Sequence, residues 1–334
     1  MKAVYISRTH KLEYGEVKKP KPKGGEALIQ VKACALNHLD LHVTKGVLDI
    51  PLPHIPGSDV AGIIEKINGN SNLKIGQEVI INPSIPCSEC RQCNKGLDCE
   101  IVTIFGYKTP GGYAEYVTVP LEQVYPKPKN VSFIEAAAFP LTFLTAHHML
   151  IRRANLQKNE TVFIWGASGG LGSAGIQIAK YLGTKIIAAT KTEEDAKKIK
   201  SIGADHIVVY SKENVVESVI RLTNNEKVDV VFESVGSETW NTSLAILRPH
   251  GRVVVAGTTS GAITSQDLSD IYYYQQTILG SRMGTKEEFE QVLKLVENSK
   301  LQPTIDSVFP LKEAHKALKK LEKSQHIGKI VLKI

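Results

Sequence analysis

Four cysteines lie close together in this chain, at Cys87, Cys90, Cys93 and Cys99. Thiolates at such spacing are ligands that Zn²⁺ prefers, and four sulfur ligands close its tetrahedral shell to water and substrate. The spacing therefore predicts one structural zinc per chain, which stabilises a lobe of the fold and performs no chemistry. The alternatives are redox-active thiols or a loop without metal. Cys34 stands alone in a strand-like run and is expected to be a small core residue.

A second motif of chemical interest follows the apolar run TVFIW (161–165). It reads Gly166-Ala167-Ser168-Gly169-Gly170-Leu171-Gly172 and leads into a predicted helix over Ser173–Leu182. Small residues at these positions let the backbone turn tightly and approach a pyrophosphate, which the free N–H groups of the helix N-terminus would bind. The motif predicts a dinucleotide-binding loop. A tight strand–helix turn without a ligand is the alternative.

The end of the next strand-like run distinguishes between cofactors. An acidic side chain there binds the ribose 2′-OH of NAD(H), whereas a cation favours the 2′-phosphate of NADP(H). The chain has Thr190-Lys191-Thr192 at this point. Glu193 lies inside the first turn of the following helix, where its simpler role is to interact with the helix dipole. We therefore predict NADPH, with NADH as the alternative. A solvated surface lysine is the alternative role for Lys191.

Short β-branched runs alternate with helix-period segments around this loop. The runs are TVFIW (161–165), KIIAAT (185–190), HIVVY (206–210), VDVVFE (228–233), RVVVA (252–256) and TILGS (277–281). Apolar runs without alternation, separated by helices, indicate a parallel sheet covered on both faces. The prediction is a doubly wound α/β domain. Thr192 with Asp195 is typical of a helix start, and Gly203 of a helix end.

The rest of the chain predicts a mostly-β domain. Strand-like runs are ALIQVKA (27–33), VAGIIEKI (60–67) and EVIINP (78–83). Ser132 with Glu135 and Thr285 with Glu288 are capping boxes that begin helices. A further helix is expected over 312–322, and the final apolar run GKIVLKI is expected to pair with the N-terminal β domain. We predict a mostly-β domain over 1–142 and 284–334, and a dinucleotide-binding domain over 143–283.

Composition excludes several classes of protein. The chain has 334 residues, of which 42% are hydrophobic, and a formal charge of +7. The lysines that carry this charge are spread along the chain rather than gathered in one stripe, so no nucleic-acid partner is expected. No apolar segment resembles a signal peptide or reaches the roughly 20 residues of a membrane span. We expect a cytoplasmic protein that does not bind membranes and acts on a small molecule.

These motifs and their order resemble the medium-chain dehydrogenase/reductase superfamily. The cysteine lobe is similar to that of zinc-containing alcohol dehydrogenases. Other segments are more similar to the quinone oxidoreductase branch, namely ALNHLD (35–40), GYAEY (112–116), PLTFLTA (140–146) and the glycine loop. The resemblance implies a GroES-like catalytic domain beside a Rossmann domain, and a homodimer or homotetramer.

The positions of a catalytic zinc distinguish the two branches. Zinc alcohol dehydrogenases hold that metal with two cysteines and a histidine, and the matching positions here are Asn37, Ser58 and Leu141. An open catalytic zinc needs about three protein ligands, so we predict no catalytic zinc. A replacement site built from His38, His42 and His54 is the alternative, although the sequence shows no helical i, i+4 face there.

The resemblance also implies roles for individual residues. Asn37 would contact the nicotinamide or the substrate carbonyl, His42 would donate a proton, and Asp40 would orient their loop. Thr142 and Tyr210 would contact the cofactor. The implied activity is NADPH-dependent hydride transfer to quinones, enones or other activated double bonds, with the nicotinamide supplying the hydride. The alternatives are a zinc-type alcohol dehydrogenase and a nucleotide-binding module with little turnover.

Overall fold

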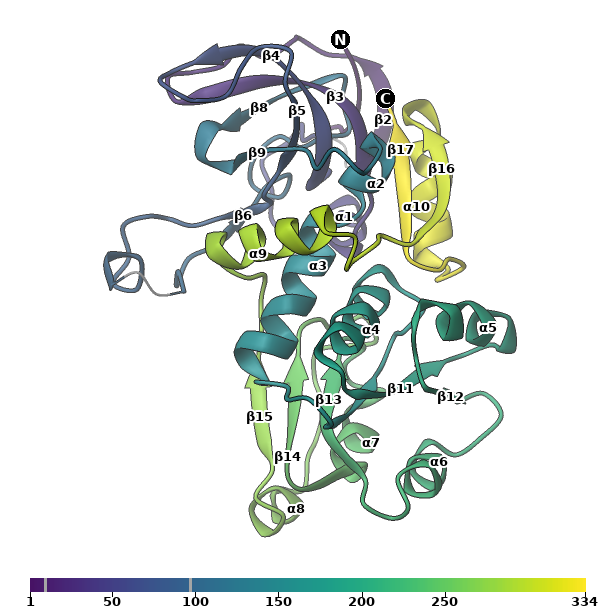
Figure 1. Cartoon of the computed structure of the whole chain (residues 1–334). Coiled ribbons are helices and arrows are strands. Elements are labelled where there is room, and N and C mark those ends of the chain that lie inside the picture. Colours follow the sequence, from purple (N-terminus) through teal and green to yellow (C-terminus); the bar gives the residue numbers. More distant parts are fainter. Residues whose placement is uncertain (9–10, 96–97) are drawn as a thin grey trace. The chain divides into compact units, whose positions relative to one another are not determined.

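The protein divides into two compact units. The structure, a computed structural model, describes residues 1–8, 11–95 and 98–334. Unit 1 comprises Met1–Leu141 with Thr285–Ile334, and unit 2 comprises Thr142–Gly284. Figure 1 shows the course of the chain through both units. Each unit contains its own cluster of buried apolar side chains.

Unit 2 is built on one parallel sheet. Its strands are β10 (Thr161–Ile164), β11 (Lys185–Thr190), β12 (His206–Val209), β13 (Val228–Glu233), β14 (Leu247–Val255) and β15 (Thr277–Gly280). They are ordered β12-β11-β10-β13-β14-β15, and every neighbouring pair is parallel. The predicted doubly wound sheet is confirmed. The strand order reverses between β10 and β13, which is where such sheets bind nucleotides.

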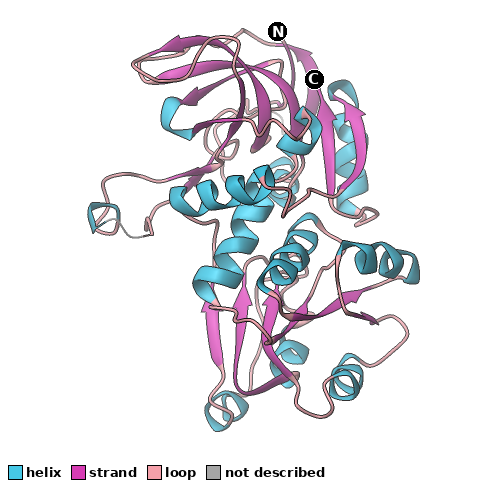
Figure 2. Ribbon diagram, in the orientation of Figure 1, coloured by secondary structure: helices cyan, strands magenta, loops and turns pink. Residues whose placement is uncertain are grey.

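Helices connect these strands and flank the sheet (Figure 2). They are α4 (Gly170–Leu182), α5 (Glu193–Ile202), α6 (Val215–Leu222), α7 (Trp240–Ala245) and α8 (Leu268–Tyr273). The side chain of Thr192 accepts the N–H of Asp195 at the start of α5, which ends at Gly203 with φ +132°, as predicted. Helix α4 begins three residues before the predicted Ser173 because its N-cap is Gly169.

Unit 1 contains a seven-stranded sheet in which β16, β17, β3, β4, β5 and β9 follow one another and β8 pairs with β3. These strands are β3 (Glu26–Ala35), β4 (Asp59–Asn68), β5 (Glu78–Ile81), β8 (Tyr116–Pro120), β9 (Val124–Pro126), β16 (Ile305–Pro310) and β17 (Lys329–Lys333). Two small sheets pair β1 (Lys2–Ile6) with β2 (Leu12–Glu16), and β6 (Ser84–Ile85) with β7 (Thr103–Ile104).

The helices of unit 1 are short, and two of them begin at the predicted caps. They are α1 (His38–Thr44), α2 (Phe133–Ala137), α9 (Lys286–Glu297) and α10 (Ala314–Glu322), with 3₁₀ turns η1 (Cys93–Lys95), η2 (Leu121–Gln123) and η4 (Leu311–Glu313). Ser132 and Thr285 form the predicted capping boxes of α2 and α9. The turn η4 occupies the start of the segment that we predicted as one helix over 312–322.

Helices α3 (Pro140–His147) and α1 carry residues of the predicted site. Helix α3 spans the boundary of the units and continues as a π-helical turn, η3 (His148–Arg153). Helix α1 corrects the prediction that no helical face exists near His38, since His38 and His42 lie four residues apart on it. Its seven residues are too few to give a detectable apolar period.

The final strand pairs as predicted with the N-terminal β domain. Strand β17 lies antiparallel to β3, with Val331 opposite Ala35, and parallel to β16. Lys329, the first residue of β17, therefore lies beside the segment that follows β3. In the part of the chain that the structure describes, no helix has both the length and the apolar character needed to cross a membrane.

Candidate functional site

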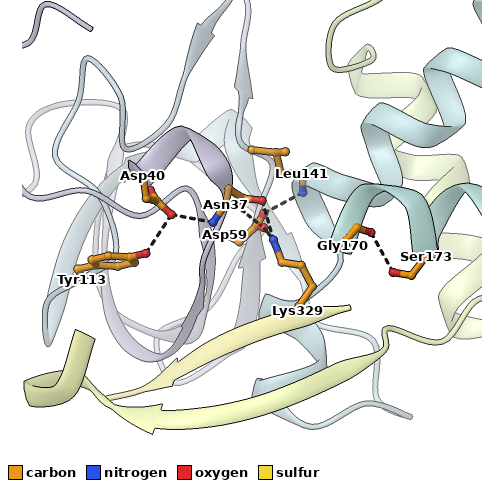
Figure 3. A network of polar contacts seen from close by, with 8 residues as sticks. All are labelled: Asn37, Asp40, Asp59, Tyr113, Leu141, Gly170, Ser173 and Lys329. Carbon is orange, nitrogen blue, oxygen red and sulfur yellow. Dashed lines mark hydrogen bonds and ion pairs between the residues drawn. The ribbon is translucent and has the colours of Figure 1, made fainter. Parts of the chain in front are cut away.

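A buried carboxylate organises a polar network in unit 1 (Figure 3). Asp59 begins β4, and its Oδ2 accepts hydrogen bonds from Asn37 Nδ2 at 2.9 Å and Lys329 Nζ at 3.0 Å. Its Oδ1 accepts the backbone N–H of Leu141 at 2.8 Å. Leu141 lies in the first turn of α3, where backbone N–H groups lack helical partners and favour a negative charge. The Asp59 carboxylate is thus satisfied by three donors.

The Lys329 ammonium neutralises this carboxylate inside the protein. The Lys329 side chain is only 4% exposed and that of Asp59 is 0% exposed. Two charges withdrawn from water are tolerated only when they are paired and hydrogen-bonded. Lys329 Nζ also donates to Asn37 Oδ1 at 2.6 Å. The Asn37 amide is therefore held in one orientation, with its oxygen toward the ammonium and its nitrogen toward the carboxylate.

A second buried carboxyl group lies next to this network. Asp40 Oδ2 accepts the backbone N–H of Asn37 at 2.8 Å and the Tyr113 hydroxyl at 2.9 Å. Burial raises the pKa of Asp40 to about 6, and it also raises the pKa of Tyr113 well above its ordinary value. Among the described residues, Asp40 Oδ1 has no hydrogen-bond partner. Asp40 thus fixes the backbone at Asn37 while its own charge is poorly solvated.

The three positions that carry zinc ligands in alcohol dehydrogenases do converge. Asn37 and the N–H of Leu141 both contact Asp59, and Ser58 directly precedes it. The Ser58 hydroxyl is fully buried and has no hydrogen-bond partner within the described part of the chain. The sequence analysis missed Asp59 and Lys329. The available signal was a lysine directly before the apolar run Ile330–Leu332 of the terminal strand.

Among the described residues, the histidines near this network do not gather as a group of metal ligands. His54 contacts the carbonyl oxygen of Gly106 through Nε2 at 3.0 Å. Burial, with smaller effects of His326, His42 and Lys329, lowers the pKa of His38 to about 4, so His38 is neutral at pH 7. In residues 1–8, 11–95 and 98–334, no group of His, Cys, Asp or Glu other than the four cysteines has metal-binding geometry. The structure therefore does not bring His38, His42 and His54 together as one group of metal ligands.

His42 itself lies on α1 and is half-buried, and its imidazole makes no hydrogen bond among the residues that the structure describes. Its assignment as proton donor stays a prediction.

Cys34 is buried in β3, and burial raises the pKa of its thiol well above the ordinary value. A thiol of this kind is a poor nucleophile, which agrees with a core role.

The glycine loop in unit 2 has the shape that a pyrophosphate requires. Gly166 has φ +60°, and a Cβ at Gly172 would lie 2.2 Å from the Gly166 carbonyl oxygen, so neither position accepts a larger side chain readily. Helix α4 starts after Gly169, and the Ser173 hydroxyl donates to the carbonyl of Gly170 at 3.1 Å (Figure 3). The N–H groups of its first turn are thus available for an anion. The residues present fit a dinucleotide.

The remaining predicted cofactor residues also belong to unit 2. Thr190 is buried at the end of β11, Lys191 is exposed directly after it, and Glu193 forms an ion pair with Lys212 at 2.6 Å. Tyr210 is 43% exposed and packs edge-on against Trp165. The buried Thr142 hydroxyl, on α3, lacks a hydrogen-bond partner among the described residues.

The cysteine cluster has the geometry of a four-sulfur site. The Sγ atoms of Cys87, Cys90, Cys93 and Cys99 all lie within 4.8 Å of one another. Individual separations are 3.5 Å for Cys87–Cys99, 3.9 Å for Cys87–Cys93 and 4.0 Å for Cys90–Cys99. A tetrahedral zinc with bonds of about 2.3 Å requires sulfur atoms roughly 3.8 Å apart. The four thiols therefore fit zinc and leave no open coordination position.

Comparisons with known proteins extend over both units. Residues 170–298 match the family described as zinc-binding dehydrogenase, and residues 23–129 match the alcohol dehydrogenase GroES-like domain. An NAD-dependent alcohol dehydrogenase of Sulfolobus acidocaldarius is 34% identical over 327 residues, which cover 94% of each chain. A quinone oxidoreductase of Pongo abelii is 30% identical over 325 residues, which cover 94% of this chain and 90% of the relative. The crystal structure of an NAD-dependent alcohol dehydrogenase superposes with a TM-score of 0.96 at 36% identity, covering 100% of both chains.

The cysteine geometry predicts that the purified protein contains about one zinc per chain. Cys93→Ser should lose the metal and lower the midpoint of thermal unfolding, because zinc binding contributes free energy of folding. Elemental analysis and thermal unfolding measure both effects. Cys34→Ala, which removes a thiol outside the cluster, should retain the zinc. A wild-type protein with no zinc, or with two equally tight zincs, would contradict this assignment.

The raised pKa of Asp40 predicts a pH-dependent stability. A carboxyl whose pKa is about 6 in the folded protein and 3.8 ordinarily contributes stability below pH 4 that is lost as the pH rises through 6. Asp40→Asn keeps an oxygen acceptor for Asn37 and Tyr113 but removes the ionisation. From pH 4 to pH 7.5, the wild type should therefore lose up to about 3 kcal/mol of unfolding free energy relative to the variant. Denaturant unfolding at both pH values measures this; an equal difference at both would refute a buried ionisable carboxyl.

Proposed function

The chain belongs to the zinc-containing medium-chain dehydrogenase/reductase superfamily and is an oxidoreductase, and we propose that it reduces quinones, enones or other activated double bonds with NADPH. The observation that carries this proposal is the buried Lys329–Asp59 ion pair at the point where Asn37, Ser58 and Leu141 converge. The bound nicotinamide would supply the hydride. The glycine loop would hold its pyrophosphate.

The ion pair argues against a catalytic zinc on these residues. The Asp59 carboxylate already accepts three hydrogen bonds, and the Asn37 oxygen faces the ammonium of Lys329. The remaining position, Ser58, offers one neutral hydroxyl. A divalent cation here would also repel the adjacent ammonium. Without metal polarisation a simple alcohol lacks stabilisation of its alkoxide, whereas an activated double bond accepts hydride with hydrogen bonding alone.

The other residues take the following proposed roles. Asn37 contacts the substrate carbonyl or the nicotinamide, Asp40 orients Asn37 through its backbone N–H, and His42 donates the proton. An imidazole side chain is a common general acid in enzymes. We further propose that the cofactor contacts Thr142 and Tyr210.

The preference for NADPH rests on the charges at the end of β11. Lys191 is exposed there, and the nearby Glu193 carboxylate is engaged by Lys212. This local environment favours a 2′-phosphate over a 2′-hydroxyl.

We also propose a cytoplasmic location, in which four reduced cysteines can bind zinc. The unpaired edge of the six-stranded sheet at β15, with Ile278 43% exposed, supports a homodimer or homotetramer.

A second candidate is a zinc-type alcohol dehydrogenase, which the name of the Sulfolobus acidocaldarius relative favours. A third is a nucleotide-binding module with little turnover. Metal content and substrate range distinguish them from the proposed reductase. Two zincs per chain with alcohol oxidation would favour the second, and tight NADPH binding without any acceptor would favour the third.

We predict that the purified protein oxidises NADPH with a quinone or an enone and is orders of magnitude slower on a primary alcohol. The loss of metal polarisation removes several kcal/mol of transition-state stabilisation, and each 1.36 kcal/mol corresponds to about tenfold in rate. Steady-state rates on the three substrates at matched concentrations measure this. Rapid alcohol oxidation that a chelator abolishes would contradict the proposal.

For the cofactor, Lys191→Ala should weaken NADPH binding about tenfold to a hundredfold, because a charge-assisted contact with phosphate contributes roughly 1.5–3 kcal/mol. Binding of NADH should change little. Fluorescence titration of both nucleotides measures the constants, and Lys158→Ala, an exposed lysine before β10, is the matched control. Equal affinity of the wild type for NADH and NADPH would overturn the assignment.

A further inference from the structure

Two N–H groups of the buried network meet no acceptor among the described residues. The Lys329 ammonium has three N–H bonds, of which two go to Asn37 Oδ1 and Asp59 Oδ2. The Asn37 amide nitrogen has two, of which one goes to Asp59 Oδ2. In the part of the chain that the structure describes, neither remaining N–H meets an acceptor. Both residues are nearly excluded from water, and a buried donor without an acceptor is unfavourable.

The two unused donors lie close together. Both nitrogen atoms contact the same carboxylate oxygen, Asp59 Oδ2, at 2.9 and 3.0 Å (Figure 3). One donor belongs to a cation and the other to a neutral amide whose orientation is fixed by Lys329. Neighbouring donors of this kind, one of them charged, favour an oxygen that carries or gains negative charge.

We propose that Asn37 and Lys329 form an oxyanion site, which binds the carbonyl oxygen of the substrate and stabilises the negative charge that develops there during reduction. This inference rests on the proposed function. When hydride from the nicotinamide adds to the β-carbon of an enone, the double-bond electrons move toward the carbonyl oxygen and give an enolate. Transfer of one proton to the α-carbon, from His42 or water, gives the saturated carbonyl compound.

Asp59 is a positioning residue of this site. It does not contact the substrate oxygen but accepts hydrogen bonds from both donor groups, and the Leu141 N–H holds its other oxygen. Its charge keeps the ammonium in place inside the protein. The donors are therefore aligned before the negative charge forms, which is the condition under which such sites accelerate a reaction most.

The first experiment tests anion binding without turnover. The zinc-loaded full chain, saturated with NADP⁺, is titrated with 4-nitrophenol at a pH below the solution pKa of this probe. The wild type should bind it as the phenolate, with the absorbance band of the anion. Lys329→Met should abolish this band. Lys127→Met is the matched control, because Lys127 is also buried, 5% exposed, and paired with a carboxylate, Glu78, outside this network. It should preserve the band.

Lys329→Met leaves the Asp59 carboxylate buried without its cation, so this single variant could fail to fold. A second variant avoids that problem. The double variant Lys329→Met with Asp59→Asn removes both charges and should fold, which circular dichroism checks. It should reduce kcat with an enone about a hundredfold, comparable to loss of an oxyanion-site donor, while the dissociation constant for NADPH changes less than about threefold. Lys329→Arg should restore part of kcat.

The outcomes separate this proposal from the proposed function. A phenolate band that depends on Lys329 in a protein that reduces neither quinone nor enone would support the oxyanion site and overturn the proposed reaction. Three results would overturn the oxyanion site: no phenolate band on the wild type, an unchanged kcat in the double variant, or an effect confined to the NADPH dissociation constant. The last would place Lys329 at the cofactor instead.

Discussion

The antiparallel pairing of β17 with β3 is the interaction on which the candidate site depends. It joins residues almost three hundred positions apart and places Lys329 beside Asn37. Without this strand the Asp59 carboxylate would be enclosed in an apolar sheet with no cation, an arrangement that destabilises a fold strongly. The sheet and the polar network therefore depend on each other. Main-chain pairing sets the register of β17, and that register sets where the ammonium lies.

Asp59 and Asp40, both buried in unit 1, show how local partners decide the role of an acid. Asp59 is bonded to a cation and to the first turn of α3. Within the described part of the chain, the Asp40 side chain accepts only from a backbone N–H and a tyrosine hydroxyl, both neutral, and burial raises its pKa. The first is suited to hold a positive charge in place. The second is suited to hold a loop, since it retains its hydrogen bonds whether or not it carries a proton.

Much of this architecture could be predicted from local sequence. Unbroken β-branched runs predicted the parallel strands. Ser132, Thr192 and Thr285 predicted helix starts. Each of these signals acts within a few residues. The cysteine spacing and the glycine loop are local in the same sense. Helix α1 was missed since one capping interaction at Asn37, rather than an apolar period, begins it. Lys329 was missed because its partners are fixed only by strand pairing across the whole chain.

The discontinuity of unit 1 has a consequence for the order of events at the ribosome. The sequence of unit 2, Thr142–Gly284, is inserted between the two segments of unit 1, which end at Leu141 and resume at Thr285. All six strands of the parallel sheet are therefore translated before β16 and β17. Unit 2 can fold while synthesis continues, but Asp59 stays without its counter-ion until β17 emerges. The nascent protein can therefore contain the whole of unit 2 while unit 1 still lacks β16 and β17.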